Sequence, residues 1–188
     1  MEPRQTPTYE ANIPADLSGD GEMACKLAAA YFGDPLPWQP HLLDAMLARD
    51  ERDRYALRAL GISIPRQNGK SWVVRARCFY GALNGEKILY TCQHGDTSDQ
   101  MFQELSQPFE DEDEAELHDL LLAVRKANGQ QAIKLRNGGL IRFTTRTDSL
   151  ARGKTYDALI YDEAQELTAK QQAASLPAIS AGSKHNPQ

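Results

Sequence analysis

Twice in this chain an apolar, strand-like run stops at a few polar residues and gives way to a helical pattern. The first case is ISIPRQNGKSWVV at 62–74, and the second is DALIYDEAQEL at 157–167. Buried strands that alternate with helices indicate an α/β fold, in which polar groups gather beyond the carboxyl ends of the strands. We therefore expect a binding site built from these two junctions.

The rest of the chain repeats the same alternation of helical and strand-like patterns. It predicts a mainly parallel β-sheet flanked by helices. An acidic run at 110–116 is interpreted as the solvated start of a helix, because acids favour helix N-termini, and a partner-docking surface is the alternative. The expected helices cover 22–32, 38–50, 69–83, 96–108 and a segment that stops at Gly129, and the expected strands cover 61–64, 86–92, 132–135, 140–145 and 157–161.

Length and composition restrict the class of protein. The 188 residues fit one domain, which we place at 22–188 after a mobile arm at 1–21. The net charge of −5 provides no general basic field, so any contact with DNA must come from a local patch or from other subunits. Three widely spaced cysteines and four scattered histidines predict neither a disulfide framework nor a metal centre. No stretch is long and apolar enough to predict a membrane span.

The first junction has the residues of a phosphate-binding loop. Gly69, Lys70 and Ser71 stand at the start of an expected helix, whose backbone N–H groups would surround phosphates. The lysine would neutralise phosphate charge and the serine hydroxyl would coordinate Mg²⁺. Ile64 occupies the place of the usual first glycine, so a surface turn before a helix is the alternative interpretation of this stretch alone.

The second junction supplies the carboxylates that nucleotide hydrolysis needs. Asp162 at the end of a strand would hold Mg²⁺ through water, and Glu163 would polarise the attacking water. A helix start decorated with acids is the alternative. Two motifs at strand-to-helix junctions, in the required order, predict nucleotide hydrolysis with Mg²⁺.

At this point the sequence resembles the ATPase domain of the large terminase subunit of tailed bacteriophages. The resemblance covers about 30–188 and rests on PWQPHLL (37–43), PRQNGKS (65–71) and TRTDSLARGKTYDALIYDEAQEL (145–167). It implies a P-loop fold of the additional-strand, conserved-glutamate type and an ATP-driven motor that threads double-stranded DNA into a procapsid. It further implies a homo-oligomeric ring, contacts with the portal and the small terminase subunit, and a location in the host cytoplasm, transiently at the portal vertex.

The resemblance also implies roles for single residues. Arg66 would act on the γ-phosphate from within its own subunit, with a surface salt bridge as the alternative. Arg152 would reach into the neighbouring subunit's ATP site, and the alternatives are a basic loop edge, or Arg146 or Arg142 in the same role. Gln39 would contact adenine, next to Trp38 in the core. The expected ATP-binding set is Gln39, Arg66, Gln67, Asn68, Gly69, Lys70 and Ser71, with Ser71 and Asp162 on Mg²⁺.

The chain departs from the family at its C-terminal side. The chain lacks dispersed acids for a nuclease and the family's coupling motif, so we expect a truncated ATPase domain with weak or absent hydrolysis and no DNA cleavage. A superfamily 2 helicase, suggested by DEAQ at 162–165, and a nucleotide-binding fragment without turnover are the alternatives. The sequence does not localise a DNA contact among its basic residues, for which solvated faces are a sufficient explanation: Arg75, Arg77, Arg125, Lys126, Lys134, Arg136 and Arg142.

Overall fold

The computed structural model divides the chain into two compact units. The first comprises Met1–Tyr80 and the second Gly81–Gln188, with helix α3 (Lys70–Leu83) running from one into the other. The structure describes residues 7, 9–14, 16–127, 129–146, 154–180 and 188.

The first unit is helical. Helices α1 (Gly21–Phe32) and α2 (Gln39–Leu47) pack together, and the start of α3 completes their core. Phe79 of α3 lies between two aromatic rings of α1, with ring centroids 5.2 Å from Tyr31 and 5.3 Å from Phe32. The three helices expected in this part of the sequence are therefore confirmed.

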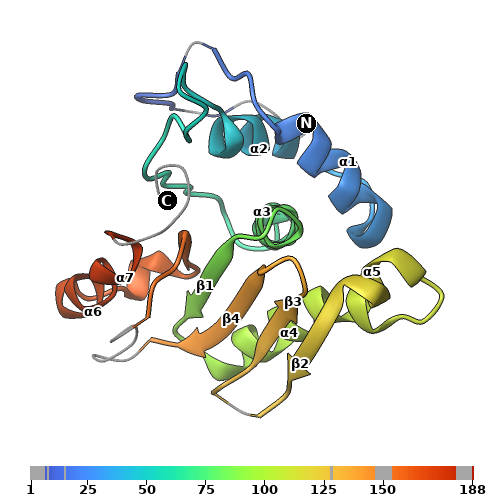
Figure 1. The fold of residues 1–188 in the computed structure, drawn as a ribbon. Coiled ribbons are helices and arrows are strands. Elements are labelled where there is room, and N and C mark those ends of the chain that lie inside the picture. The colour runs from blue at the N-terminus through green and yellow to red at the C-terminus, as the bar shows by residue number, and fades with distance from the viewer. Residues whose placement is uncertain (1–6, 8, 15, 128, 147–153, 181–187) are drawn as a thin grey trace. The chain divides into compact units, whose positions relative to one another are not determined.

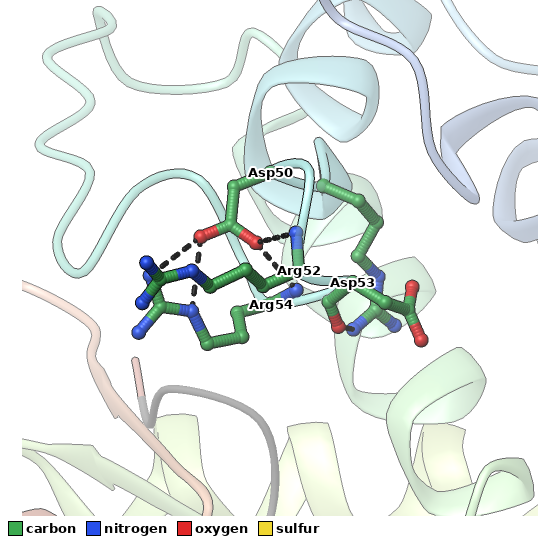
Figure 2. A network of polar contacts seen from close by, with 5 residues as sticks. Asp50, Arg52, Asp53 and Arg54 are labelled. Atoms are coloured by element: carbon green, nitrogen blue, oxygen red, sulfur yellow. Dashed lines mark hydrogen bonds and ion pairs between the residues drawn. The ribbon is translucent and has the colours of Figure 1, made fainter.

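The turn after α2 is closed by one carboxylate. Asp50 Oδ1 accepts the backbone N–H groups of Arg52 and Arg54, each at 2.9 Å, and its Oδ2 accepts Nε and Nη2 of Arg54 (Figure 2). These bonds favour the charged carboxylate and lower the pKa of Asp50 to about 2. Ahead of α1, Gly19 forms a β-bridge with Ala48. The mobility expected of the arm at 1–21 stays a prediction.

The prediction of a strand at 61–64 is wrong. The segment forms no strand, and the described chain before the phosphate loop contributes only two isolated bridges, between Gly19 and Ala48 and between Arg49 and Tyr55. Ile62 and Ile64 are half-buried, whereas Gly61 and Ser63 are exposed. Because strand preference measures packing on a half-buried sheet, this alternation alone does not form a strand.

The second unit contains a five-stranded sheet in the order β2-β3-β4-β1-β5 (Figure 1). Strand β1 (Lys87–Cys92) pairs in parallel with β4 (Leu140–Thr145) and β5 (Ala158–Tyr161). Strands β2 (Leu121–Arg125) and β3 (Ala132–Leu135) add antiparallel pairs at the other edge. The sheet is therefore mixed, which corrects the expectation of a mainly parallel one.

Two antiparallel strand pairs form this edge of the sheet, and the sequence predicts one of them. The hairpin expected from Arg-Asn-Gly-Gly at 136–139 is confirmed, with Gly138 at a φ of 93° in its turn. The helix expected to continue to Gly129 is wrong, because α5 (Ala115–Leu120) stops and the chain becomes β2. Pairing of β2 with β3 decides this segment, since cross-strand packing overrides local helix preference.

Helix α4 (Gly95–Glu110) covers one face of this sheet and confirms the helix expected at 96–108. Its Phe102 meets the edge of Phe143 on β4 at 5.4 Å, and Phe143 lies 5.8 Å from Tyr90 on β1. On the other face, Leu89 of β1 packs with Tyr156 and Ala178. The acidic run at 110–116 is exposed, as expected for a solvated helix start.

Strand β5 leads into short helical segments. A 3₁₀ turn, η1 (Ala164–Glu166), follows directly and replaces the longer helix expected there, and α6 (Ala169–Ser175) and α7 (Pro177–Ser180) come after it. Thr168 and Gln171 form a reciprocal capping box at the start of α6. No helix in the described part of the chain is long and apolar enough to cross a membrane.

Candidate functional site

The phosphate-loop motif forms a tight turn that ends at the first residue of α3. Gln67 has a φ of 60° and Gly69 a φ of 77°, so left-handed residues make the bend that the usual first glycine would assist. The Asn68 amide donates to the carbonyl of Arg66 at 3.1 Å. Lys70 then begins the helix, as the sequence predicts. The positive end of a helix dipole lies at this turn, which favours an anion.

Gln39 ties this turn to the start of α2. Its side chain is 1% exposed, and its Nε2 donates to the carbonyl of Gly69 at 2.7 Å. Its Oε1 accepts the backbone N–H of Leu36 at 2.6 Å. One amide hydrogen and one lone pair of Gln39 remain for another partner. Contact with adenine stays a prediction, and Trp38 packs against the apolar core as expected.

The loop is closely packed at its glycine. A Cβ atom at Gly69 would lie 2.7 Å from Gln39 Nε2 and 3.0 Å from the Leu36 side chain. Glycine is therefore required here both for its φ and for space. Arg66 is exposed in the same turn, and no carboxylate in the described ranges forms an ion pair with it.

The carboxylate motif lies in the second unit, directly beyond β5. Asp162 is 5% exposed, and its Oδ2 accepts a hydrogen bond from the hydroxyl of Tyr90 at 2.9 Å. Its Oδ1 accepts the backbone N–H of Glu163 at 2.8 Å. Its own N–H donates to the carbonyl of Thr91 on β1 at 2.8 Å. The carboxylate is therefore fixed through both of its oxygens.

Glu163 has two unusual features. Its backbone is left-handed, with φ 55° and ψ 46°. A non-glycine residue in this region costs on the order of 1 kcal/mol, and such residues cluster at functional sites. Its Oε2 is buried and accepts no hydrogen bond from the described residues. A buried carboxylate oxygen without a partner fits a site for water or a cation.

Arg146 donates hydrogen bonds to the backbone of the turn that carries Asp162 and Glu163. It follows β4 directly, is 6% exposed, and donates from Nη1 to the carbonyl of Asp162 at 2.5 Å and from Nη2 to that of Glu163 at 2.9 Å. Both bonds are within the chain, so Arg146 does not fit the alternative role of reaching a neighbouring subunit. Arg142 lies within β4, and Arg152 falls outside the described residues.

Cys92 ends β1 beside the carboxylates. Its thiol donates to the carbonyl of His94 at 3.0 Å. Burial raises the pKa of Cys92 to about 11, and the negative charges of Glu163 and Asp162 act in the same direction. The thiol is therefore protonated at neutral pH, and it carries no charge beside the two carboxylates.

The carboxylate turn offers oxygen ligands that suit Mg²⁺ bound together with a nucleotide. No group of three metal-ligating side chains exists among the described residues. Mg²⁺ keeps several waters and is bound by one or two carboxylates together with substrate phosphates. A fixed Asp162 beside the unpartnered oxygen of Glu163 fits that mode of binding.

Sequence reasoning missed two residues that build the carboxylate site. Tyr90 lies within an apolar strand run, where a tyrosine is read as core. For Arg146, the sequence suggests only the role of an arginine that reaches into a neighbouring subunit's ATP site. A usable signal existed for Arg146, since it follows a strand parallel to β1 and so ends at the same edge of the sheet as Asp162.

Comparison with known proteins supports the fold. No protein-family profile matches the chain, and no curated protein matches its sequence. The structure matches the crystal structure of the HK97 bacteriophage large terminase with a TM-score of 0.65 at 15% sequence identity. The match covers 90% of this chain and 36% of that one, so this chain spans about a third of its length. The resemblance seen in the motifs is confirmed at the level of structure: the chain has a large-terminase-like α/β fold.

Proposed function

We propose that this chain is the ATPase domain of a viral DNA-packaging motor. The observation that carries the proposal is the buried turn of Asp162 and Glu163 beyond β5, in a chain whose fold is that of a large terminase. A fixed carboxylate followed by one with an unpartnered oxygen suits the division of labour in phosphoryl transfer, where one acid serves the metal and the next serves the water.

The proposal assigns each residue a role in hydrolysis. As the family resemblance implies, Lys70 would bind the phosphates, and Ser71 and Asp162 would hold Mg²⁺. Bound with ATP, Mg²⁺ supplies neutralisation of phosphate charge. Glu163 accepts a proton from the attacking water through its buried Oε2, and the Tyr90 hydroxyl keeps Asp162 oriented.

The remaining assignments follow the family resemblance. Arg66 acts on the γ-phosphate within the subunit, Arg152 completes a neighbour's site, and Gln39 contacts adenine. Gln67, Asn68 and Gly69 supply the turn that surrounds the phosphates. In the full motor the partners are double-stranded DNA, the portal, the procapsid, the small terminase subunit and further copies in a ring, in the host cytoplasm.

The test separates nucleotide binding from turnover. Calorimetry with ATP and Mg²⁺ and a phosphate-release assay are applied to the 188-residue chain. We expect Lys70→Ala to abolish binding, and Glu163→Gln to retain binding while losing turnover. Glu166→Gln is the matched control, because Glu166 is an exposed acid in the adjoining 3₁₀ turn.

Two results would contradict the proposal. One is a wild-type chain that binds no ATP in the presence of Mg²⁺. The other is a Glu163→Gln variant that hydrolyses ATP at the rate of the Glu166→Gln control. Strand separation by the wild-type chain would favour a helicase instead.

A further inference from the structure

One face of the sheet in the second unit gathers basic side chains from three neighbouring strands. Arg125 of β2 pairs with Ala132 of β3, which pairs with Arg142 of β4. Residues directly opposite each other in a sheet point to the same face, so both arginines share one side. Lys134 lies two residues after Ala132 and therefore points to that side as well. Lys154, in the segment leading to β5, belongs to the same group.

These four cations form what we call the cationic face: Arg125, Lys134, Arg142 and Lys154. Arg125, Lys134 and Lys154 are exposed, and Arg142 is half-buried. Partial desolvation and then the positive charges of the other three residues lower the pKa of Lys154. No carboxylate of the described ranges forms an ion pair with any of the four. Among the described residues, no ion pair compensates the charge on this face.

The remainder of this side of the sheet is apolar and covered. Leu89 lies opposite Arg142 across the β1–β4 pair and is buried against Tyr156 and Ala178. The cationic face thus occupies the β2–β3–β4 part, next to this apolar cluster, which Leu140 of β4 extends to the position opposite Lys134. Strands 4.7–4.9 Å apart carry Arg125 and Arg142 about 10 Å from each other. The face offers several separate points of positive charge rather than one pocket.

Other basic residues singled out in the sequence are already engaged. Arg77 is 3% exposed, and Arg75 lies over the ring of Phe32 at 5.5 Å. Lys126 pairs with Glu110 of α4 at 2.7 Å, on the opposite side of the sheet, and Arg136 donates to the carbonyl of Asp119 at 2.9 Å. The structure therefore reduces seven scattered candidates to one group.

We propose that the cationic face binds the sugar–phosphate backbone of duplex DNA. The inference rests on the proposed function, since it names the surface by which the motor domain would contact its track. A chain with a net charge of −5 repels DNA except where positive charge is concentrated. Arginine and lysine side chains spread over neighbouring strands can reach phosphate oxygens, and contacts to phosphates carry no base preference. Contact without sequence preference is what movement along DNA requires.

The salt dependence of DNA binding measures the number of phosphate contacts. Each contact contributes a slope of about −0.9 in log K against log salt. Four contacts predict a loss of roughly 150-fold in affinity between about 50 and 200 mM salt, and two contacts a loss of roughly 12-fold. The double variant Arg125→Gln/Lys134→Gln tests this difference, because both side chains are exposed and their replacement leaves the core untouched.

The matched control is Lys26→Gln/Lys126→Gln, which removes the same charge from two lysines that are ion-paired with Glu22 of α1 and Glu110 of α4. Fluorescence anisotropy with a labelled duplex is used for the full 188-residue chain and both variants. We expect the test variant to show the smaller slope and the control to keep that of the wild type. Equal slopes for the two variants would overturn the proposal, as would tighter binding to polyglutamate than to duplex of equal charge.

Calorimetry with ATP and Mg²⁺ on the same preparations separates this proposal from the function it rests on. A wild-type chain that binds ATP but no duplex at low salt overturns the cationic face as a DNA site and leaves nucleotide binding standing. A chain that binds duplex with the expected slopes but no ATP supports the surface and contradicts the ATPase. The two failures are therefore distinguishable.

Discussion

Replacing Arg146 by methionine should destabilise the second unit and release the turn that carries the carboxylates. The guanidinium donates two hydrogen bonds to consecutive carbonyls, those of Asp162 and Glu163. Hydrogen bonds from a charged donor contribute about 1.5–3 kcal/mol each. Burying a guanidinium with its Nε unpartnered offsets part of this gain, and methionine removes that cost while filling much of the space. We expect a net loss of about 2–4 kcal/mol in the free energy of unfolding.

Urea denaturation followed by far-ultraviolet circular dichroism measures this loss. With a slope of about 1–3 kcal/mol per molar urea, the midpoint should fall by roughly 1–2 M. Arg136→Met is the control, because Arg136 is exposed and donates one bond to the carbonyl of Asp119. Arg146→Lys should recover only part of the loss, since an ammonium lacks the planar fork that spans two carbonyls.

Amide hydrogen exchange distinguishes positioning from general stability. The N–H of Glu163 donates to Asp162 Oδ1, and that bond depends on the geometry of the turn. In Arg146→Met it should exchange faster under native conditions, while amides of β1 keep their protection relative to global stability. If Arg146→Met and Arg136→Met lose the same stability and Glu163 exchanges as in the wild type, the reasoning is refuted.

Three further outcomes follow from the contacts described above. Gln39→Leu should lose about 1–3 kcal/mol in the free energy of unfolding, because it removes two part-buried hydrogen bonds, to the N–H of Leu36 and the carbonyl of Gly69. Urea denaturation monitored by tryptophan fluorescence checks this loss. The pKa of Asp50 in the folded chain, about 2, lies below its ordinary value of 3.8. The stabilisation by this carboxylate is therefore present above about pH 4 and is lost as the pH falls through 2. In an NMR titration of the carboxyl group, Arg54→Gln should move the midpoint of Asp50 up towards 3.8. Cys92, with a pKa of about 11 and no exposed surface, should resist iodoacetamide at pH 8 in the folded chain and react in urea, as mass spectrometry would detect.

Local patterns of residues were sufficient for most elements. The helical spacing at 69–83 corresponds to α3, and the Asn-Gly turn predicts the hairpin of β3 and β4. The acids at 162 and 163 stand directly beyond a strand, as their place in the motif requires. These features depend on neighbouring residues, and periodicity and turn chemistry report such short-range preferences directly.

The predictions of secondary structure were wrong for segments that depend on contacts with residues far away in the chain. Arg125 and its neighbours form a strand because they pair with β3. The segment that contains Ile62 and Ile64 pairs with no strand and stays irregular. Local propensity is too weak a preference to decide such cases.

The sequence by itself determined the fold class, the order of most elements and the identity of both polar motifs. Only the tertiary structure decided that the sheet is mixed, that Tyr90 and Arg146 hold the carboxylate turn, and that basic residues from three strands share one face. The physical reason is the same in each case. Strand order, register and burial are set by contacts between residues far apart in the chain, and a linear pattern does not record which of those residues meet.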